Sequence, residues 1–375
     1  MSDDVLFDAT TVNDLTLENR AGLAPMTRVS ASADGRATDE MARYYAKFAD
    51  GGFSFLVTEG VYTDDAYSQG YLNQPGLVTD DHVAAWTQVT DAVHDADTPI
   101  FAQLMHAGAQ SQGNPHVDGE VTLGPSPVQP TGEQAEPYGG SGEFAVSKEA
   151  TAADLEVVLE GFVDAATNAV EAGFDGVEVH GANGYLLNEF LAADANQRDD
   201  EYGGAPEDRV RFPAEVVSAI DDAVPDDFVV GVRVSQTKVT DDSYEWPEGE
   251  DAAAVFFAEF SSAGADYVHT TEPDATTPAF GDDGPTLADA AVEYVQDGTV
   301  VIANGGLGDP NAARQTVDAG ADLFTLGTSA LANPDWPTRV ADGDALEEFD
   351  PTAFLAPMAR ISDHEVPADA PPADD

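Results

Sequence analysis

The sequence predicts an α/β fold, a (β/α)8 TIM barrel. Eight apolar runs of strand length alternate with segments of helical periodicity, which is the pattern of a parallel sheet wrapped by helices. The runs end in polar or glycine residues, and a (β/α)8 barrel keeps its active site at such strand ends. A doubly wound sheet would give the same count, but it usually carries a Gly-rich dinucleotide turn after an early strand, and this chain has none. The barrel is therefore favoured.

The predicted elements follow one another as strand and helix pairs. Strands are expected near 21–25, 53–58, 99–104, 174–180, 228–234, 265–271, 299–303 and 321–327, where apolar runs are short and bounded. Helices are expected near 38–50, 80–96, 151–172, 206–223, 250–263, 286–296, 310–319 and 333–341. The start at Asp309 is well marked, because a capping acid precedes Pro310 at the first helical position.

One elaborated domain, residues 1–362, accounts for most of the chain. Its 375 residues exceed the ~250 of a typical barrel. Residues 107–149 interrupt the third strand and helix pair with Gly, Pro, Ser and Gln and show no helical period. So long a loop in a compact domain is usually functional, and we expect it to cap the mouth of the barrel. Residues 363–375 are predicted to form an acidic, disordered tail.

Acidic residues dominate the charge. There are 71 Asp and Glu against 14 Lys and Arg, a formal net charge of −57. Such a charge repels nucleic acid and anionic membranes, and self-repulsion destabilises the compact state until counterions screen it. A Debye length of ~3 Å at 1 M salt would remove most of that repulsion. Because 42% of the residues are hydrophobic, a core can still form. We therefore predict a halophilic protein that loses structure in dilute buffer.

Cysteine, metal and membrane chemistry find no support in the sequence. The absence of cysteine excludes disulfides, thiolate metal sites and cysteine-ligated iron–sulfur clusters. The seven histidines form no pair at ligand spacing, so no metal site is expected and a metal hydrolase is disfavoured. The start lacks signal-peptide features and no stretch of ~18 apolar residues occurs. We expect a soluble, cytoplasmic protein.

The segment from Val177 to Tyr185 carries the strongest chemical signal. Alternation along the strand directs Glu178 and His180 toward the barrel axis. If the chain turns helical after His180, Asn183 follows at a three-residue offset and lies beside it. Two neutral donors converging on one point would polarise a carbonyl, as an oxyanion hole does, with Tyr185 close by. The alternative is a core histidine followed by ordinary helix-start residues.

Arg233 and Gln103 mark two further strand ends. Arg233 shares its strand face with Gly231, so its guanidinium should point into the barrel, where it needs an anion or a planar array of acceptors. A structural ion pair with Glu178 on the neighbouring strand and a direct role in ligand binding both fit this position. Gln103 carries a terminal amide, which offers a donor and an acceptor together.

Similar short motifs recur at most of the strand ends. They are Ala24-Pro25-Met26-Thr27, Thr58-Glu59-Gly60, Ala102-Gln103-Leu104, Val177 to Tyr185, Val232-Arg233-Val234, Asn304-Gly305-Gly306 and Leu326-Gly327-Thr328. Other matching segments are Gln197 to Gly204, Asp208-Arg209, Arg211, Tyr267 to Pro273 and Ala332 to Asp335. In this order, and over nearly all of residues 5–342, the chain resembles the Old Yellow Enzyme family of FMN-dependent ene-reductases.

The resemblance implies FMN as the cofactor. It implies that Thr27 donates to the flavin O4, that Gln103 reads the pyrimidine edge and that Arg233 lies at the N1/O2 edge. Gly60 would allow close backbone approach to the ring. The other implied cofactor-binding residues are Ala24, Pro25 and Met26, with Asn304, Gly305, Gly306, Gly327 and Thr328 at the phosphate. Late barrel loops commonly bind phosphate through backbone N–H groups.

The chain departs from the family pattern at three positions. Thr328 stands where many relatives carry an arginine that clamps the FMN phosphate. A hydroxyl can bond to phosphate but brings no charge, so FMN affinity should depend on salt. Ala109 stands where arginine is common and Asp208 where asparagine is common, and both substitutions alter loop packing.

By the resemblance, the activity is reduction of α,β-unsaturated carbonyl compounds, enones or enals. NADPH or NADH reduces the flavin, hydride passes from N5 to the β-carbon, and Tyr185 protonates the α-carbon while His180 and Asn183 hold the oxygen. The sequence leaves open the physiological substrate, the choice between NADPH and NADH, and whether the protein is a monomer or a homo-oligomer. Arg36, Arg43 and Lys238 are the candidate partners for a 2′-phosphate.

Three other functions compete with this interpretation. A 2,4-dienoyl-CoA reductase of the same barrel type would need an iron–sulfur cluster, which a cysteine-free chain cannot ligate. A Schiff-base aldolase or isomerase would use Lys238, the one lysine near a strand end, although no acid–base group is tied to it by spacing. A barrel that only stores flavin would have no need for Tyr185 beside His180 and Asn183.

Overall fold

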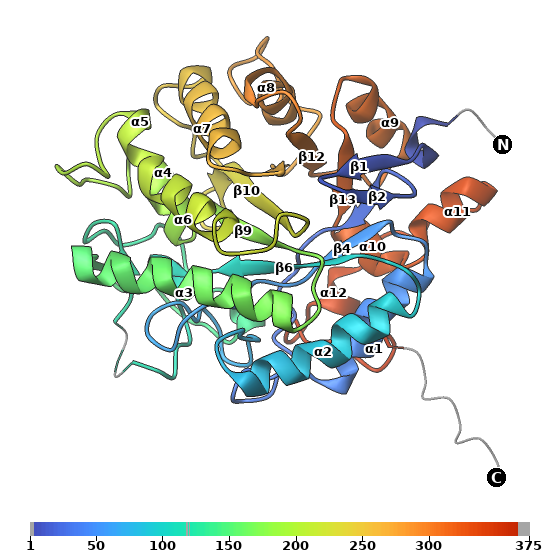
Figure 1. Cartoon of the computed structure of the whole chain (residues 1–375), viewed down its shortest axis with the longest axis horizontal. Helices are drawn as coiled ribbons and strands as arrows, with labels where there is room; N and C mark the ends of the chain where they lie inside the picture. Colours follow the sequence, from blue (N-terminus) through green and yellow to red (C-terminus); the bar gives the residue numbers. More distant parts are fainter. Residues whose placement is uncertain (1–3, 118, 120, 367–375) are drawn as a thin grey trace.

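The computed structural model describes residues 4–117, 119 and 121–366, and its centre is a closed barrel of eight parallel strands (Figure 1). In chain order they are β3 (Ala21–Leu23), β4 (Phe55–Val57), β6 (Ile100–Met105), β9 (Gly176–Asn183), β10 (Val229–Lys238), β11 (Tyr267–Thr271), β12 (Val300–Asn304) and β13 (Leu323–Leu326). Each strand pairs with the next, and β13 pairs with β3 to close the ring. The predicted TIM barrel is confirmed, and the doubly wound alternative is wrong.

Helices surround the barrel (Figure 1). They are α1 (Asp39–Asp50), α2 (Asp80–His94), α3 (Ala152–Glu171), α5 (Pro206–Arg209), α6 (Arg211–Asp221), α7 (Glu250–Ser262), α8 (Leu287–Tyr294), α9 (Pro310–Asp318), α10 (Thr328–Ala332) and α11 (Trp336–Asp342). Two predicted helices differ in extent. The segment 206–223 is divided into α5 and α6, and the helix expected at 333–341 begins only at Trp336.

Side-chain caps fix the starts of α1, α2, α3, α8 and α9, whereas α6 and α7 begin without one. A threonine hydroxyl accepts a hydrogen bond from the N–H three residues on at Thr38, Thr79, Thr151 and Thr286. Each such bond satisfies a donor that has no partner within the helix. Asp309 caps α9 by accepting from the N–H of Asn311, two residues on, with Pro310 at the first helical position as predicted. These caps set where each chain segment turns after leaving a strand end.

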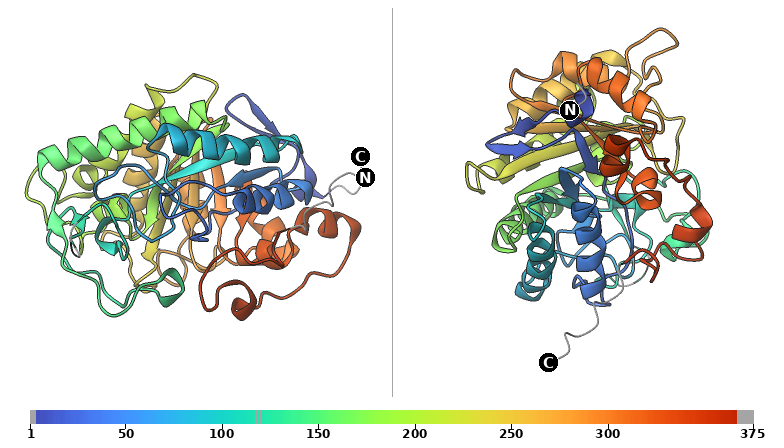
Figure 2. Two further views of the ribbon diagram at one scale, coloured as in Figure 1. Left: turned by 90° about the horizontal axis from the view of Figure 1, so that it is seen from below. Right: turned by 90° about the vertical axis from the view of Figure 1, so that its right-hand side faces the viewer.

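The barrel interior is packed at one end and functional at the other. Phe55, Phe101 and Tyr267 belong to the apolar cluster inside the strands. The antiparallel hairpin of β1 (Thr10–Val12) and β2 (Leu15–Leu17) adds buried side chains to that cluster. It lies at the end of the barrel opposite the 107–149 insertion (Figure 2). The hairpin was not predicted, because three-residue strands are too short to give a period.

The 107–149 insertion and the C-terminal segment lie on the same side of the barrel (Figure 2). The insertion contains the short helices η2 (Gly108–Gln110) and η3 (Glu136–Tyr138) and the parallel pair of β7 (Leu123–Gly124) with β8 (Lys148–Glu149). The N–H of Ala359 donates to the carbonyl of Pro137 over 2.9 Å. The insertion and the C-terminal segment therefore meet at the end of the barrel that carries the predicted site.

Several short elements escaped the sequence analysis. They are η1 (Val5–Phe7), β5 (Val61–Tyr62), α4 (Leu186–Leu191), α10 and α12 (Pro351–Phe354). β5 extends the sheet beside β6. None of the helices among the described residues is both long and apolar enough to cross a membrane.

The predicted boundary of the tail at residue 363 is too early. Glu365 is buried, and both of its carboxylate oxygens bind the guanidinium of Arg28, at 2.6 and 2.7 Å. The Arg28 guanidinium also donates to backbone carbonyls of the C-terminal segment, among them that of Ala359. No pattern in the sequence indicates that an acid in this region has a buried cationic partner. The rest of the predicted tail, residues 367–375, lies outside the described residues.

Candidate active site

A cavity of about 230 Å³ opens at the carboxyl ends of the barrel strands. The predicted site residues that line it are Pro25, Met26, Thr27, Gln103, His180, Asn183, Tyr185, Arg233 and Thr328. They lie at or just after the ends of five barrel strands, β3, β6, β9, β10 and β13, and the fold brings them to one place. Other lining residues, which the sequence analysis did not select, are Arg28, Met105, Tyr138, Val239, Leu331 and Leu355.

Asn183 lines the cavity, but with a backbone conformation that differs from the predicted one. The chain does not turn helical after His180, because β9 continues to Asn183 and pairs there with Lys238 of β10. Asn183 then adopts φ = 65°, a left-handed conformation that asparagine tolerates better than most residues. Its backbone N–H donates to Ser235 Oγ over 2.7 Å, and its carbonyl accepts from Gln110 Nε2 over 3.0 Å. These bonds hold the bend that places its side chain in the cavity.

His180 offers an unpaired ring nitrogen. Its side chain is buried, and no described residue lies within hydrogen-bonding distance of Nδ1. Burial, reinforced by the nearby positive charge of Arg233, lowers the pKa of His180 to about 3. The imidazole is therefore neutral near pH 7, and a buried polar atom without a partner is a candidate to bind a ligand.

Tyr185 is part of a cluster of aromatic residues. Its hydroxyl forms a short hydrogen bond with the hydroxyl of Tyr71, and its ring centroid lies 5.1 Å from that of His180. The ring of Tyr138 packs 5.1 Å from that of Tyr71. Burial raises the pKa of Tyr185 to about 12, so the phenol keeps its proton near neutral pH. Tyr71 lies in a loop and Tyr138 in the short helix η3, and neither belongs to a strand-end motif, so no sequence pattern marked them.

Glu178 faces the barrel interior, as predicted, and is fully buried. It accepts hydrogen bonds from Gln103 Nε2 at 2.8 Å, from the Tyr267 hydroxyl at 3.2 Å and from His269 Nδ1 at 2.7 Å. Burial alone would raise the pKa of Glu178, but His269, the positive charge of Arg233 and the Gln103 amide lower it to about 2. The carboxylate therefore fixes the orientation of the Gln103 amide at the cavity.

Arg233 does not form the ion pair with Glu178 that was one of its two predicted roles. Its Nη2 donates instead to Thr271 Oγ1 over 3.0 Å and to Asn304 Oδ1 over 2.8 Å. Both acceptors are neutral, so the positive charge stays available at the cavity. Its Nε is buried without a partner among the described residues. This donor set suits a planar, electron-accepting ring, which is the role the sequence left open for Arg233.

The loops after β12 and β13 lie where the sequence places a phosphate site. Gly305 and Gly306 both have positive φ, at 134° and 65°, which glycine adopts without strain. Gly327 precedes α10, which begins at Thr328. A Cβ built on Gly306 would lie 3.6 Å from the carboxyl carbon of Asp274. An acid, Asp274, therefore stands beside this loop.

Ala24 and Gly60, two of the predicted cofactor-binding residues, do not line the cavity but contact residues near it. Ala24 is buried, and its Cβ lies 4.0 Å from a Cβ built on Gly327. A Cβ on Gly60 would collide with the sulfur of Met105, which lines the cavity. The glycine is therefore required to seat Met105, a reason that the sequence did not reveal.

Lys238 does not line this cavity. Its ammonium binds both carboxylate oxygens of Asp194, at 2.5 and 2.6 Å, and lies 3.8 Å from the centre of the Tyr244 ring. A Schiff-base lysine must be a free nucleophile. The pairing of Lys238 argues against the aldolase or isomerase alternative.

Comparisons with known proteins identify the family to which the chain belongs. The sequence profile of the NADH:flavin oxidoreductase / NADH oxidase family matches residues 5–347. A probable flavin mononucleotide-dependent alkene reductase of Leishmania infantum is 34% identical, over 94% of each chain. This chain belongs to the Old Yellow Enzyme family. Membership in this FMN-dependent family implies FMN and a reduced nicotinamide as the redox partners.

Solved structures of Old Yellow Enzyme homologues share the whole fold. The homologue from Zymomonas mobilis superposes with a TM-score of 0.85 at 28% identity, over 96% of this chain and 98% of that one. Morphinone reductase in complex with tetrahydroNAD gives a TM-score of 0.82 at 30% identity, over 96% and 98%. The chain spans only 51% of the NADH oxidase of Thermoanaerobacter brockii, to which it is 30% identical. The complete activity of such longer relatives therefore does not transfer to this chain directly.

Proposed function

We propose that this protein is an FMN-dependent ene-reductase that uses NADPH or NADH to reduce the C=C bond of an enone or enal. The observation that carries the proposal is the convergence of neutral His180, Asn183 and protonated Tyr185 on one cavity beside the cationic Arg233. The relative from Leishmania infantum, described as an alkene reductase, supports the same reaction.

The residues at the cavity fit FMN. Thr27, Gln103 and Arg233 would hold the flavin ring, and the unpaired Nε of Arg233 and the fixed amide of Gln103 offer donors to its polar edge. Ala24, Pro25 and Met26 would support the ring. The loops at Asn304 to Gly306 and at Gly327 to Thr328 would hold the phosphate. Bound FMN would supply the chemistry of hydride transfer between the reduced nicotinamide and the β-carbon of the substrate.

His180 and Asn183 would hold the carbonyl oxygen of the substrate. A neutral imidazole donates from one ring nitrogen, and the amide of Asn183 supplies a second donor. Two donors aimed at one oxygen stabilise the negative charge that develops there as the β-carbon is reduced. Since the pKa of His180 is about 3, these two groups orient and polarise the substrate without transferring a proton to it.

Tyr185 would supply the proton to the α-carbon. Its phenol is protonated across the physiological range, because its pKa is raised to about 12. The hydroxyl of Tyr71 binds the Tyr185 hydroxyl and would stabilise the phenolate left behind. The ring of Tyr185 beside His180 puts the proton donor next to the group that holds the oxygen.

An anaerobic redox titration in molar salt tests this function. Protein loaded with FMN should lose its flavin absorbance when NADPH or NADH is added, and regain it when 2-cyclohexenone follows. A flavin that is reduced but stays reduced in the presence of several enones and enals would contradict the ene-reductase assignment. The same titration compares the two nicotinamides, which the structure of the site does not distinguish.

A further inference from the structure

A second cavity, of about 250 Å³, lies beside the active site. Most of its wall belongs to the insertion. The rest comes from residues 184–195, around α4, and from residues 238–240, at the end of β10. Its apolar lining includes Pro125, Val128, Pro130 and Ala195. Ala109, one of the three departures from the family pattern, also lines it, and its short side chain leaves this space open.

A shared wall separates the second cavity from the active site. Residues 183–185 and 238–240 form it, joined where the N–H of Val239 donates to the carbonyl of Asn183 over 3.1 Å. Within this wall, residues that are neighbours in sequence face opposite cavities. The residues that line the active site are Asn183, Tyr185 and Val239, whereas those that line the second cavity are Gly184, Lys238 and Thr240. The two cavities are therefore distinct and adjacent.

Glu189 gives the second cavity an unsatisfied polar group. Its side chain lines the cavity but is only 4% exposed. Oε1 accepts from the N–H of Ala109 over 2.8 Å, whereas Oε2 has no partner among the described residues. Burial raises the pKa of the Glu189 carboxyl well above its ordinary value. A protonated carboxyl is a hydrogen-bond donor, and a buried donor needs an acceptor.

The other charged groups that face the cavity cancel each other. Lys238 and Asp194 both line it, and they form a close ion pair. They are also the charged groups that shift the pKa of Glu189, in opposite directions. With Glu189 protonated, the cavity carries no net charge. A charged ligand would lose its hydration without gaining a counter-ion, so the cavity favours an uncharged one.

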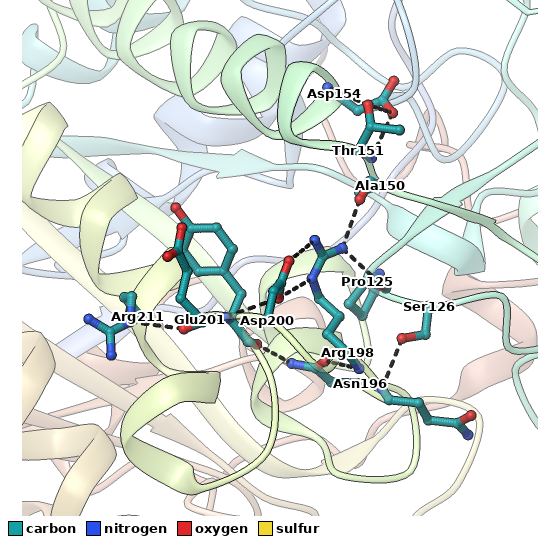
Figure 3. Close-up of polar contacts among 12 residues, drawn as sticks. Pro125, Ser126, Ala150, Thr151, Asp154, Asn196, Arg198, Asp200, Glu201 and Arg211 are labelled. Atoms are coloured by element: carbon teal, nitrogen blue, oxygen red, sulfur yellow. Dashed lines mark hydrogen bonds and ion pairs between the residues drawn. The ribbon is translucent and has the colours of Figure 1, made fainter.

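The wall formed by Pro125 and Ser126 is held rigidly (Figure 3). The guanidinium of Arg198 donates to the carbonyls of Pro125 at 3.1 Å and Ala150 at 2.7 Å, and it pairs with Asp200 at 2.5 Å. The N–H of Gln197 donates to Ser126 Oγ over 2.9 Å. Because Gln197 and Arg198, in the loop between α4 and α5, hold this wall in place, the cavity is preformed, as ligand sites usually are.

We propose that this second cavity is a binding site for a small uncharged carbonyl compound, whose oxygen accepts a hydrogen bond from Glu189 and whose apolar body packs on Pro125, Val128 and Pro130. Sites for drug-sized molecules have volumes of roughly 300–1,000 Å³, so this cavity suits a ligand the size of a cyclic ketone. The proposal goes beyond the proposed function, because it assigns a site that takes no part in the reaction.

Calorimetric titration with cyclohexanone, which the enzyme cannot reduce as an alkene, tests the site. The titration uses FMN-loaded wild type, Ala195→Leu and the control Ala214→Leu. Ala195→Leu fills the cavity from its rim, whereas Ala214→Leu makes the same change on α6, away from both cavities. The flavin absorbance reports occupancy of the active site alone, so heat that continues after this absorbance saturates belongs to the second site. We expect two sites in the wild type and in Ala214→Leu, and one in Ala195→Leu.

The pH dependence of the second site tests the role of Glu189. A group whose pKa is raised keeps its proton at low pH and loses it as pH rises through that pKa. Second-site affinity of the wild type should therefore fall roughly tenfold, about 1.4 kcal/mol, as Glu189 ionises, whereas Glu189→Gln, which keeps an N–H donor, should retain it. One site in the wild type, or a second site indifferent to Ala195→Leu, would overturn the proposal. The calorimetric titration and its pH dependence both measure binding and need no turnover. They would therefore still test the second site if the proposed ene-reductase reaction were not found.

Discussion

At the scale of single residues, Asn183 combines backbone strain with a role in the site. It adopts φ = 65°, a region in which most L-residues are destabilised by a close contact between Cβ and the carbonyl oxygen. Asparagine reduces that cost because its short polar side chain suits this region. Glycine would remove the strain but also the amide. The position thus requires a residue that accepts the bend and still donates to a substrate oxygen.

Two substitutions at Asn183 separate these requirements. Asn183→Gly and Asn183→Ala both lose the side-chain amide, so both should raise KM for the enone. Asn183→Ala should in addition be less stable than Asn183→Gly by about 1 kcal/mol, because its Cβ is strained at positive φ. Denaturant unfolding and steady-state kinetics measure the two effects. Equal stability of the two variants would show that the left-handed bend is not maintained.

Tyr71 should assist proton transfer through Tyr185. Tyr71→Phe removes the hydroxyl that bonds to Tyr185, and re-oxidation of the reduced enzyme by the enone should slow by roughly tenfold, the value of about one hydrogen bond. Tyr138→Phe is the matched control, since the Tyr138 ring packs on Tyr71 and its hydroxyl makes no hydrogen bond to Tyr185. Stopped-flow absorbance gives both rates. Identical rates in the two variants would rule out this role for Tyr71.

The sequence identified residues best where a short strand end carried them. His180, Gln103 and Arg233 line the cavity as predicted, because alternation along a buried strand decides which side chains point inward. Tyr71 and Tyr138 were missed, because their positions depend on how two irregular loops pack and not on any period. The partners of Arg233 were also missed, since they come from β11 and β12 and only the closed barrel brings them together.

At the scale of elements, the late barrel loops hold the proposed phosphate site without a cation. Thr328 begins α10 and is exposed, and Asp274 lies beside Gly306. A negative side chain near a bound phosphate weakens its binding by direct repulsion, and salt screens this repulsion. FMN affinity should therefore be governed by backbone donors and by ionic strength.

Substitutions in these loops should change FMN affinity in a predictable direction. Thr328→Arg should tighten FMN roughly tenfold or more at low salt, since a charge-assisted bond contributes about 1.5–3 kcal/mol. Asp274→Asn should tighten it by removing the repulsion, and both gains should shrink in molar salt. Quenching of flavin fluorescence measures the dissociation constants. If Thr328→Arg left the FMN affinity unchanged, the phosphate would not bind beside residue 328.

The sequence predicted the main strands and helices better than their ends. Eight bounded apolar runs became the eight barrel strands, because burial on both faces selects such runs. The end of β9 was misjudged, because the extra residues to Asn183 are held by Ser235 and Lys238, which are distant in sequence. The hairpin of β1 and β2 is stable only because it covers the open end of the barrel.

At the scale of the whole molecule, the charge of −57 dominates the energetics. Repulsion between exposed carboxylates falls as salt shortens the Debye length, whereas buried contacts such as the Arg28–Glu365 pair are screened much less. Added salt should therefore relieve repulsion at the surface and leave the buried pairs intact.

The melting temperature should therefore rise as KCl is raised from dilute buffer to the molar range. Differential scanning calorimetry in KCl, with glycerol of matched osmolality as the control, distinguishes charge screening from a general osmolyte effect. A melting temperature that is unchanged between dilute buffer and molar KCl would contradict the predicted halophilic character.

Tyr185, His180 and Asn183 should act on the enone and not on the nicotinamide. The most direct measurement is stopped-flow absorbance of Tyr185→Phe, following flavin reduction by the nicotinamide and re-oxidation by 2-cyclohexenone separately. We predict that reduction keeps close to the wild-type rate while re-oxidation slows by roughly 10²–10⁴-fold, the usual contribution of a positioned proton donor. Equal losses in the two half-reactions, with the flavin still bound, would contradict this assignment.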